Sequence, residues 1–263
     1  MTTDSPVLTE RRGDVTIVTL NSPARRNALS MPMRFELVRV LREIHADAGC
    51  RAIVVQGAAG HFCAGSDLAE DMANTAPEGL NERRARMVPC HDYLRLLCAG
   101  PKPVVAAVTG AAAGIGMATA LACDFVVADE TAKFVAAFGR VGYIPDGGLL
   151  WSLTQRVGLA TGRDLMLTAR TVDSAEASRI GLVDQLVPAG QALHAALEKT
   201  RSYAGIAPLA MREMKSLLAR PPQTMEQAFQ MELDIQSALG MTEDCREAKR
   251  AFLEKRPPVF KAR

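Results

Sequence analysis

Gly60-His61-Phe62-Cys63-Ala64-Gly65-Ser66-Asp67-Leu68 is the stretch that decides the fold, together with Gly110-Ala111-Ala112-Ala113-Gly114-Ile115-Gly116. Each stretch follows an apolar, strand-like run, Ile53 to Gln56 in the first case and Val104 to Val108 in the second. The small residues let the backbone turn tightly and come close to a ligand. Two such turns can aim two backbone N–H groups at one point, which is how enzymes stabilise an oxyanion. The acid or base opposite that point then determines the reaction.

The composition restricts the class of protein. The 263 residues suit one large domain, or one domain with a helical appendage. An apolar share of 48% is ample for a buried core, and 23% charged residues is ordinary for a soluble protein. The net charge of +2 argues against nucleic acid as a partner, because such binding needs a concentrated basic surface.

The cysteines and the N-terminus indicate the compartment. The six cysteines form no CxxC pair, so we expect no metal site. Reduced thiols are typical of a cytoplasmic protein. The first ten residues carry no apolar signal core, and glycines interrupt the long apolar run after Val104. We therefore expect a cytoplasmic protein that neither is secreted nor binds a membrane.

The hydropathy pattern alternates between short apolar runs and amphipathic segments. Val15 to Leu20 predicts a strand, and Ser30 predicts the N-cap of a helix with apolar residues from Met33 to Ile44 on one face. A polar segment at about residues 71–81 predicts a mobile loop. Further strands are expected at residues 53–56, 104–108, 124–128, 133–135 and 182–187, and further helices at 82–97, 114–123, 164–167 and 174–179.

This order of elements predicts the domain organisation. Strands followed by helices indicate an α/β fold in which helices cover the faces of a sheet. From Ala189 onward the pattern is mainly helical. We expect a core over residues 1–200 and a C-terminal helical region over residues 201–263.

Six motifs follow one another in an order that resembles a known family. They are FCAGSDL, KPVVAAVTGAAAGIG, ACDFVVADETAKF, VGYIPDGG, LMLTARTVDSAEASRIGLVDQLVP and AFLEKRPPVF. The ordered set resembles the crotonase, or enoyl-CoA hydratase/isomerase, superfamily from about Val15 to Phe260. AKFVAAF, the IPDGG turn and EKRPPVF are most similar to the enoyl-CoA isomerases of bacterial phenylacetate degradation.

The resemblance carries expectations about fold, assembly and substrate. It implies a crotonase-type spiral of ββα units with a C-terminal helical trimerisation region. It implies a homotrimer or a dimer of trimers, and acyl-CoA thioesters as substrates. No separate cofactor is expected, because coenzyme A is part of the thioester.

The resemblance also assigns roles to individual positions. The amides of Ser66 and Ile115 would form the oxyanion hole. Phe252 and Lys255 would contact coenzyme A, often from a neighbouring subunit. The positions implied to bind coenzyme A are Arg25, Arg26, Ala28, Ala64, Asp67, Leu68, Phe252 and Lys255.

Two positions depart from the pattern of the family's hydratases. Those enzymes use two glutamates to activate and deliver water, and this chain has Ala118 and Phe138 at the corresponding positions. Neither side chain can exchange a proton. Ordinary hydration of a 2-enoyl-CoA by that route is therefore in question.

Asp146, in the turn from Gly142 to Gly148, is the remaining candidate base. In the resembling isomerases an aspartate at this turn is the catalytic base, and one carboxylate suffices for a 1,3-proton shift. Apolar neighbours would raise its pKa and make it a better base. The alternative is a turn aspartate that caps the following helix. For His91 we expect a surface role.

Three functions remain open. The first is an isomerase that moves a double bond from the 3 to the 2 position of an acyl-CoA, with Asp146 as the proton shuttle. The second keeps the fold but is a hydratase, or a hydrolase or dehalogenase that uses Asp146 as a nucleophile. The third is a non-catalytic acyl-CoA-binding protein, for which the missing glutamates and the unusual Ile115 argue.

Overall fold

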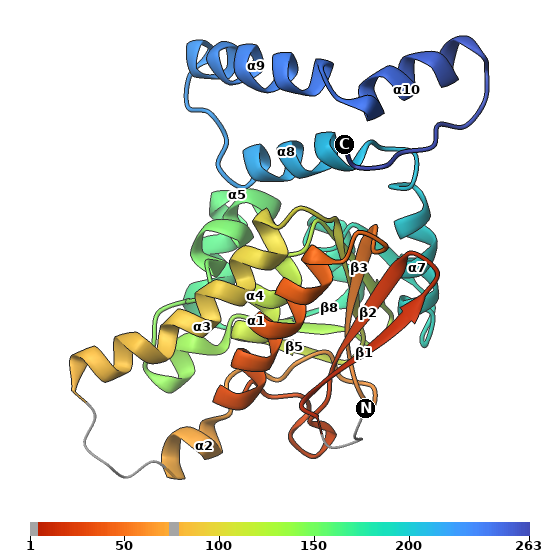
Figure 1. Cartoon of the computed structure of the whole chain (residues 1–263). Helices are drawn as coiled ribbons and strands as arrows, with labels where there is room; N and C mark the ends of the chain where they lie inside the picture. Colours follow the sequence, from red (N-terminus) through yellow and green to blue (C-terminus); the bar gives the residue numbers. More distant parts are fainter. Residues whose placement is uncertain (1–4, 74–78) are drawn as a thin grey trace.

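A six-stranded sheet forms the centre of the molecule (Figure 1). The computed structural model describes residues 5–73 and 79–263. The first two strands of the sheet pair antiparallel, and all the others pair parallel. The strand order is β1 (Val7–Arg12), β2 (Val15–Leu20), β3 (Ala52–Gly57), β4 (Val104–Val108), β6 (Phe125–Asp129) and β9 (Gln185–Val187).

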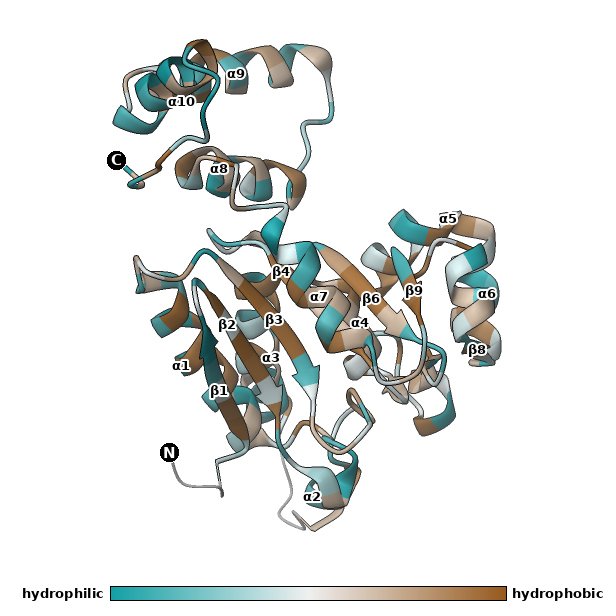
Figure 2. Cartoon of the chain, turned by 90° about the vertical axis from the view of Figure 1, so that its right-hand side faces the viewer, coloured by the Kyte–Doolittle hydropathy of each residue, from teal (hydrophilic) through white to brown (hydrophobic). Residues whose placement is uncertain are grey.

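The central strands are apolar on both faces because helices cover both. Val55 of β3 belongs to the larger apolar cluster, on the side of α1 and α3. Val54, one residue earlier, lies in the smaller cluster beside Val105, its partner in β4. Ala196 of α7 (Ala192–Arg201) completes this smaller cluster. Each valine fully removed from water contributes about 2 kcal/mol. The brown colour of the central strands in Figure 2 marks their residues as hydrophobic.

Helix α1 (Met31–Ala46) confirms the predicted start signal. Ser30 is its N-cap, and the Ser30 hydroxyl accepts a hydrogen bond from the Met33 amide at 3.4 Å. Pro32 is tolerated because it lies in the first turn, where the amide needs no helical partner. The buried face of α1 packs against α3 (Leu80–Ala99), which lies beside it in Figure 1.

Short strands and helices complete the spiral of ββα units. A second sheet has the order β5 (Ala111–Ala113), β7 (Lys133–Val135) and β8 (Thr171–Asp173). Strand β4 leads into β5 and helix α4 (Ile115–Leu121), and β6 leads into β7 and then helix α5 (Leu149–Thr168). The remaining short elements are η1 (Pro23–Arg25), α2 (Leu68–Ala73), η2 (Ala137–Val141) and α6 (Ser174–Arg179).

The C-terminal helices form a separate layer at the top of Figure 1. They are α8 (Pro208–Leu218), α9 (Met225–Gly240) and α10 (Glu243–Leu253). Lys215 of α8 attaches this layer to the core, because its ammonium donates to the Leu97 carbonyl at 2.9 Å and pairs with Asp124. None of the residues of α9 is buried, although it carries apolar side chains such as Phe229 and Leu233.

Several boundaries differ from those expected. The sequence pattern gave no prediction for β1 and located only residues 164–167 of α5, because Gly158 interrupts that helix with a φ of 76°. Strand β9 is shorter than the predicted 182–187. The predicted loop at 71–81 begins within α2, and residues 74–78 of it lie outside the described residues. Within the described chain, no helix is both long and apolar enough to cross a membrane.

Candidate active site

The two glycine-containing stretches lie side by side. The Phe62 amide donates to the Thr109 carbonyl at 2.8 Å, and the Cys63 amide donates to the Ala111 carbonyl at 2.8 Å. The Ala113 amide returns a bond of 3.0 Å to the Cys63 carbonyl. Cys63 and Ala112 thus form a parallel bridge. Two segments fifty residues apart in the sequence therefore meet at the same end of the sheet.

Glycine makes this close approach possible. A Cβ atom on Gly116 would overlap the Cys63 carbonyl oxygen and lie 2.7 Å from the Cys63 Cβ. A Cβ atom on Gly110 would overlap the Gly60 carbonyl and lie 2.7 Å from His61 Nδ1. Contacts this short are forbidden by hard-sphere repulsion. The second turn can only approach the first because these positions carry no side chain.

The amides of Ser66 and Ile115 remain available. Ile115 is the first residue of α4, whose early amides have no intrahelical acceptor. Ser66 lies between Gly65 and Asp67, and these two neighbours form the hydrogen bonds to Leu29. Across residues 5–73 and 79–263, no hydrogen bond uses either amide. The helix dipole of α4 adds partial positive charge at this point.

Asp146 lies in the loop between η2 and α5. Its Oδ1 is buried and has no hydrogen-bond partner. The N-cap of α5 is Gly148, with no side-chain capping bond, so Asp146 does not have the helix-capping role considered above. Burial raises the pKa of the Asp146 carboxyl, and the nearby Arg34 and His91 lower it in part. A half-buried carboxylate with a buried, unpartnered oxygen is a candidate for acid–base chemistry.

Apolar side chains surround this loop. A Cβ atom on Gly147 would overlap Ile115 Cδ1 and lie 3.0 Å from the Ala118 Cβ, so the Asp146 loop lies directly against α4. Phe138 is buried, and its ring atom Cζ lies 3.9 Å from the Cβ position of Gly114. Both positions that differ from the glutamates of hydratases thus form part of the wall around the turns.

Arg34 is a neighbour of this site that the sequence analysis missed. Its side chain is only 9% exposed. One guanidinium nitrogen donates to the Ser66 hydroxyl at 3.0 Å, and Nε donates to the Leu29 carbonyl at 3.2 Å. Arg34 lies three residues before Leu37 on the buried face of α1, so the helical period could have identified it. His91 is also near Asp146, which argues against the surface role expected for it.

Six of the eight positions assigned to coenzyme A lie together beside the first turn. The Ala64 amide donates to the Arg26 carbonyl at 3.0 Å, and the Leu29 amide donates to the Gly65 carbonyl at 2.7 Å. Arg25 contacts both carboxylate oxygens of Asp67, at 2.6 and 2.7 Å. The six are Arg25, Arg26, Ala28, Ala64, Asp67 and Leu68.

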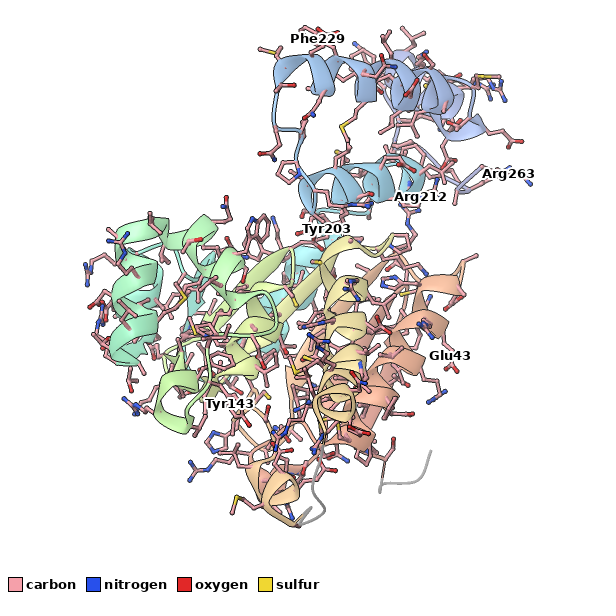
Figure 3. All side chains as sticks on the ribbon, turned by 90° about the vertical axis from the view of Figure 1, so that its left-hand side faces the viewer. Glu43, Tyr143, Tyr203, Arg212, Phe229 and Arg263 are labelled. Atoms are coloured by element: carbon pink, nitrogen blue, oxygen red, sulfur yellow. The ribbon has the colours of Figure 1, made fainter. Side chains whose placement is uncertain are left out.

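Phe252 and Lys255 lie elsewhere. Phe252 belongs to α10 and is 84% exposed, and Lys255 follows that helix. Figure 1 shows α10 at the opposite end of the molecule from α2. In Figure 3, Tyr143 of the Asp146 loop is likewise far from Phe229 and Arg263. Within one chain, these two residues therefore do not reach the candidate site.

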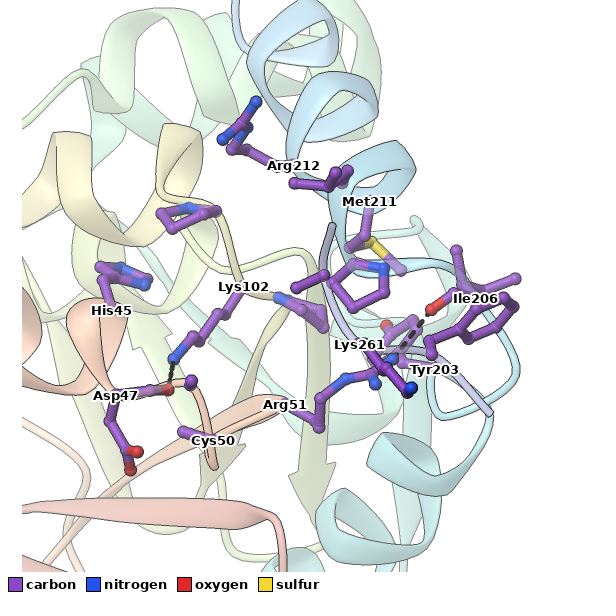
Figure 4. A pocket seen from close by; sticks show the side chains of 17 residues that line it. His45, Asp47, Cys50, Arg51, Lys102, Tyr203, Ile206, Met211, Arg212 and Lys261 are labelled. Atoms are coloured by element: carbon purple, nitrogen blue, oxygen red, sulfur yellow. Dashed lines mark hydrogen bonds between the residues drawn. The ribbon is translucent and has the colours of Figure 1, made fainter. Parts of the chain in front are cut away.

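A cavity of about 330 Å³ lies at the other end of the sheet, between the core and α8 (Figure 4). Lys102 on its wall donates to the carbonyls of Ile44 and Asp47, and Arg51 donates to the Ile206 carbonyl at 2.9 Å. These bonds fix the ends of elements around the cavity. No cluster of residues suited to hold a metal ion occurs in the described ranges.

Comparisons with known proteins identify the family of this chain. Residues 10–263 match the family model described as enoyl-CoA hydratase/isomerase. The chain belongs to the enoyl-CoA hydratase/isomerase family. It is therefore an α/β protein of the crotonase fold and an enzyme of a family that acts on CoA thioesters.

Individual members of the family are similar over nearly their whole length. The 2,3-dehydroadipyl-CoA hydratase of Escherichia coli K12 is 34% identical over 98% of this chain and 100% of the relative. The 1,2-epoxyphenylacetyl-CoA isomerase of the same organism is 32% identical over 97% of each. The crystal structure of an enoyl-CoA hydratase from Polaromonas sp. JS666 has a TM-score of 0.90 and 32% identity over 97% of this chain and 99% of that one.

Proposed function

We propose that this family member is an acyl-CoA isomerase that moves a double bond from the 3 to the 2 position. The observation that carries the proposal is the buried, unpartnered Oδ1 of Asp146, in a loop whose next residue, Gly147, lies against Ala118. Neither position of the two glutamates carries a carboxylate, and Asp146 is the candidate base that remains among the described residues. One carboxylate can remove a proton from one carbon of the substrate and return it two carbons away.

In this mechanism the thioester carbonyl oxygen accepts hydrogen bonds from the Ser66 and Ile115 amides. Asp146 removes a proton from the α-carbon, and the negative charge moves onto that oxygen. The two amides stabilise the enolate, each by about 3 kcal/mol. Asp146 then delivers the proton to the γ-carbon, which leaves the double bond conjugated with the carbonyl.

Coenzyme A binding is part of the proposal. Arg25 and Arg26 would contact the phosphates, and the backbone from Ala64 to Leu68 would line the pantetheine and adenine. Phe252 and Lys255 would contact coenzyme A from a second subunit, because their own chain holds them away from the site. A homotrimer or dimer of trimers, formed through the region of residues 201–263, would supply that subunit. No further cofactor takes part.

Hydration is the second candidate, because many of the similar relatives carry hydratase names. Incubation with 3-hexenoyl-CoA and, separately, with crotonyl-CoA distinguishes the two reactions. We expect conversion of 3-hexenoyl-CoA to the 2-enoyl ester without a gain of water by mass spectrometry. Rapid addition of water to crotonyl-CoA would support a hydratase. A covalent acyl or aryl adduct on Asp146 would support a hydrolase or dehalogenase, and binding of esters without any turnover would support a binding protein.

A further inference from the structure

Arg34 is a buried cation whose charge no neighbouring carboxylate neutralises at contact distance. It pairs with no Asp or Glu within 4.0 Å in the part of the chain that the structure describes. Its hydrogen bonds go to three neutral groups, the Leu29 carbonyl, the Ser66 hydroxyl and the Met31 sulfur. Burial of an uncompensated charge costs several kcal/mol, so such a group is retained for a reason other than stability.

The charge of Arg34 acts on the proposed reaction centre. It interacts electrostatically with Asp146, and also with Cys63, Cys90 and Tyr93. Arg34 forms no salt bridge with Asp146, so the two charges interact over more than 4.0 Å.

Arg34 is related to both ends of the proposed charge movement. Arg34 contacts Ser66, whose amide faces the proposed oxyanion, while Asp146 begins the reaction as an anion. When Asp146 takes the α-proton, negative charge leaves the carboxylate and appears at the thioester oxygen. The negative charge thus passes from a carboxylate that Arg34 influences to the turn that Arg34 contacts, so the guanidinium can stabilise it at both places.

We propose that Arg34 is a positioning residue of the proton-transfer site, which holds the Ser66 turn by a hydrogen bond and stabilises both the ionised Asp146 and the enolate by its charge. This inference rests on the proposed function. It predicts that removal of the charge makes Asp146 harder to ionise, because the larger of the two positive influences that oppose burial is then lost.

The other groups around Asp146 define the controls. The groups that interact electrostatically with it are Arg34 of α1 together with Cys90 and His91 of α3, and the α4 side chains nearest to the neighbouring Gly147 are the apolar Ile115 and Ala118. His91 lowers the pKa of the Asp146 carboxyl less than Arg34 does. Arg39 lies on the same helix but is exposed and pairs with Glu36 and Glu43.

The test compares Arg34→Met, Arg34→Lys, His91→Gln and Arg39→Met after circular dichroism has shown that each is folded. The first readout uses no substrate. The carboxyl carbon of Asp146 is titrated by ¹³C NMR and assigned by its loss in Asp146→Asn. We expect a higher midpoint in Arg34→Met, a partial return in Arg34→Lys, a smaller displacement in His91→Gln and none in Arg39→Met.

The second readout is the pH profile of α-proton exchange. The acid limb should move to higher pH in Arg34→Met, and each unit of displacement lowers the rate at a fixed acid pH about tenfold. An unchanged Asp146 midpoint in folded Arg34→Met would overturn the inference. If the wild type exchanged no proton with any ester, the proposed function would fail, while the NMR titration would still decide the role of Arg34.

Discussion

The Cys63 carbonyl accepts a hydrogen bond of 3.0 Å from the Ala113 amide, while the Cys63 amide donates to the Ala111 carbonyl at 2.8 Å. This pairing joins the two turns of the candidate active site. Ser66 follows Cys63 by three residues, and Ile115 follows Ala113 by two. The relative position of the two free amides is therefore fixed by backbone bonds, which do not depend on the side chains at either position.

Gly116→Ala should separate the turns. The new Cβ has no space beside Cys63, so we expect a loss of stability of about 1–3 kcal/mol. Catalytic activity should fall further than stability alone explains. Gly139→Ala is the matched control, because nothing lies within 4 Å of its Cβ position. Urea denaturation measures both variants, and equal stability of the two would refute this steric account.

The pair of the buried Lys215 and the partly exposed Asp124 should attach the C-terminal helices to the core. Lys215→Met leaves the Asp124 carboxylate, whose side chain is 25% exposed, without its cation, and we expect it to cost at most about 3–5 kcal/mol. The double variant Lys215→Met/Asp124→Asn should recover most of that loss, because no charge is left unpaired. Thermal denaturation of the two variants tests this, and a double variant less stable than the single one would contradict it.

His45 should make the protein sensitive to acid. Burial lowers the pKa of its imidazole to about 4 from the ordinary 6.5. Between these values the unfolded chain binds a proton that the folded protein does not, so the free energy of unfolding falls as the pH decreases. The slope from this one group is at most about 1.4 kcal/mol per pH unit.

His45→Gln should remove that slope between pH 6.5 and 4, as measured by urea denaturation at several pH values. The exposed His194 supplies the control variant His194→Gln. A pH dependence of stability that persists in His45→Gln and disappears in His194→Gln would show that the assignment is wrong.

Arg25 should contribute to coenzyme A binding. We expect Arg25→Met to raise the KM for a full CoA ester about tenfold, which corresponds to the loss of about 1.4 kcal/mol from a charged contact. The KM for an N-acetylcysteamine thioester, which lacks the nucleotide, should not change. Arg39→Met serves as the control for a lost surface cation. An equal effect on both thioesters would mean that Arg25 acts through Asp67 on the turn instead.

Much of the fold was predictable because its signals are local. Ser30 caps α1 as expected, and the buried strand Val104–Val108 was found from its continuous apolar run. The ordered motifs also predicted the family correctly. Helix α5 was only partly predicted, because Gly158 breaks its periodicity and packing across the kink cannot be seen in the sequence.

The site was predictable only where single residues carry the signal. The sequence placed Asp146 in a turn before a helix, but only the structure shows that its side chain does not cap that helix. Arg34 was missed because an arginine on a helix is normally exposed, although its spacing from Leu37 places it on the buried face of α1, and its contact with Ser66 is seen only in the structure. The roles of Ser66, Ile115 and the residues assigned to coenzyme A stay predictions.

The central claim is that Asp146 is the base that moves the proton. Exchange of the α-protons of 3-hexenoyl-CoA with deuterated water, measured by mass spectrometry, tests it most directly in the wild type and in Asp146→Asn. The account predicts rapid exchange in the wild type and a loss of about 10²–10⁴-fold in the variant, whose affinity for the ester should persist. Exchange at the wild-type rate in folded Asp146→Asn would contradict it.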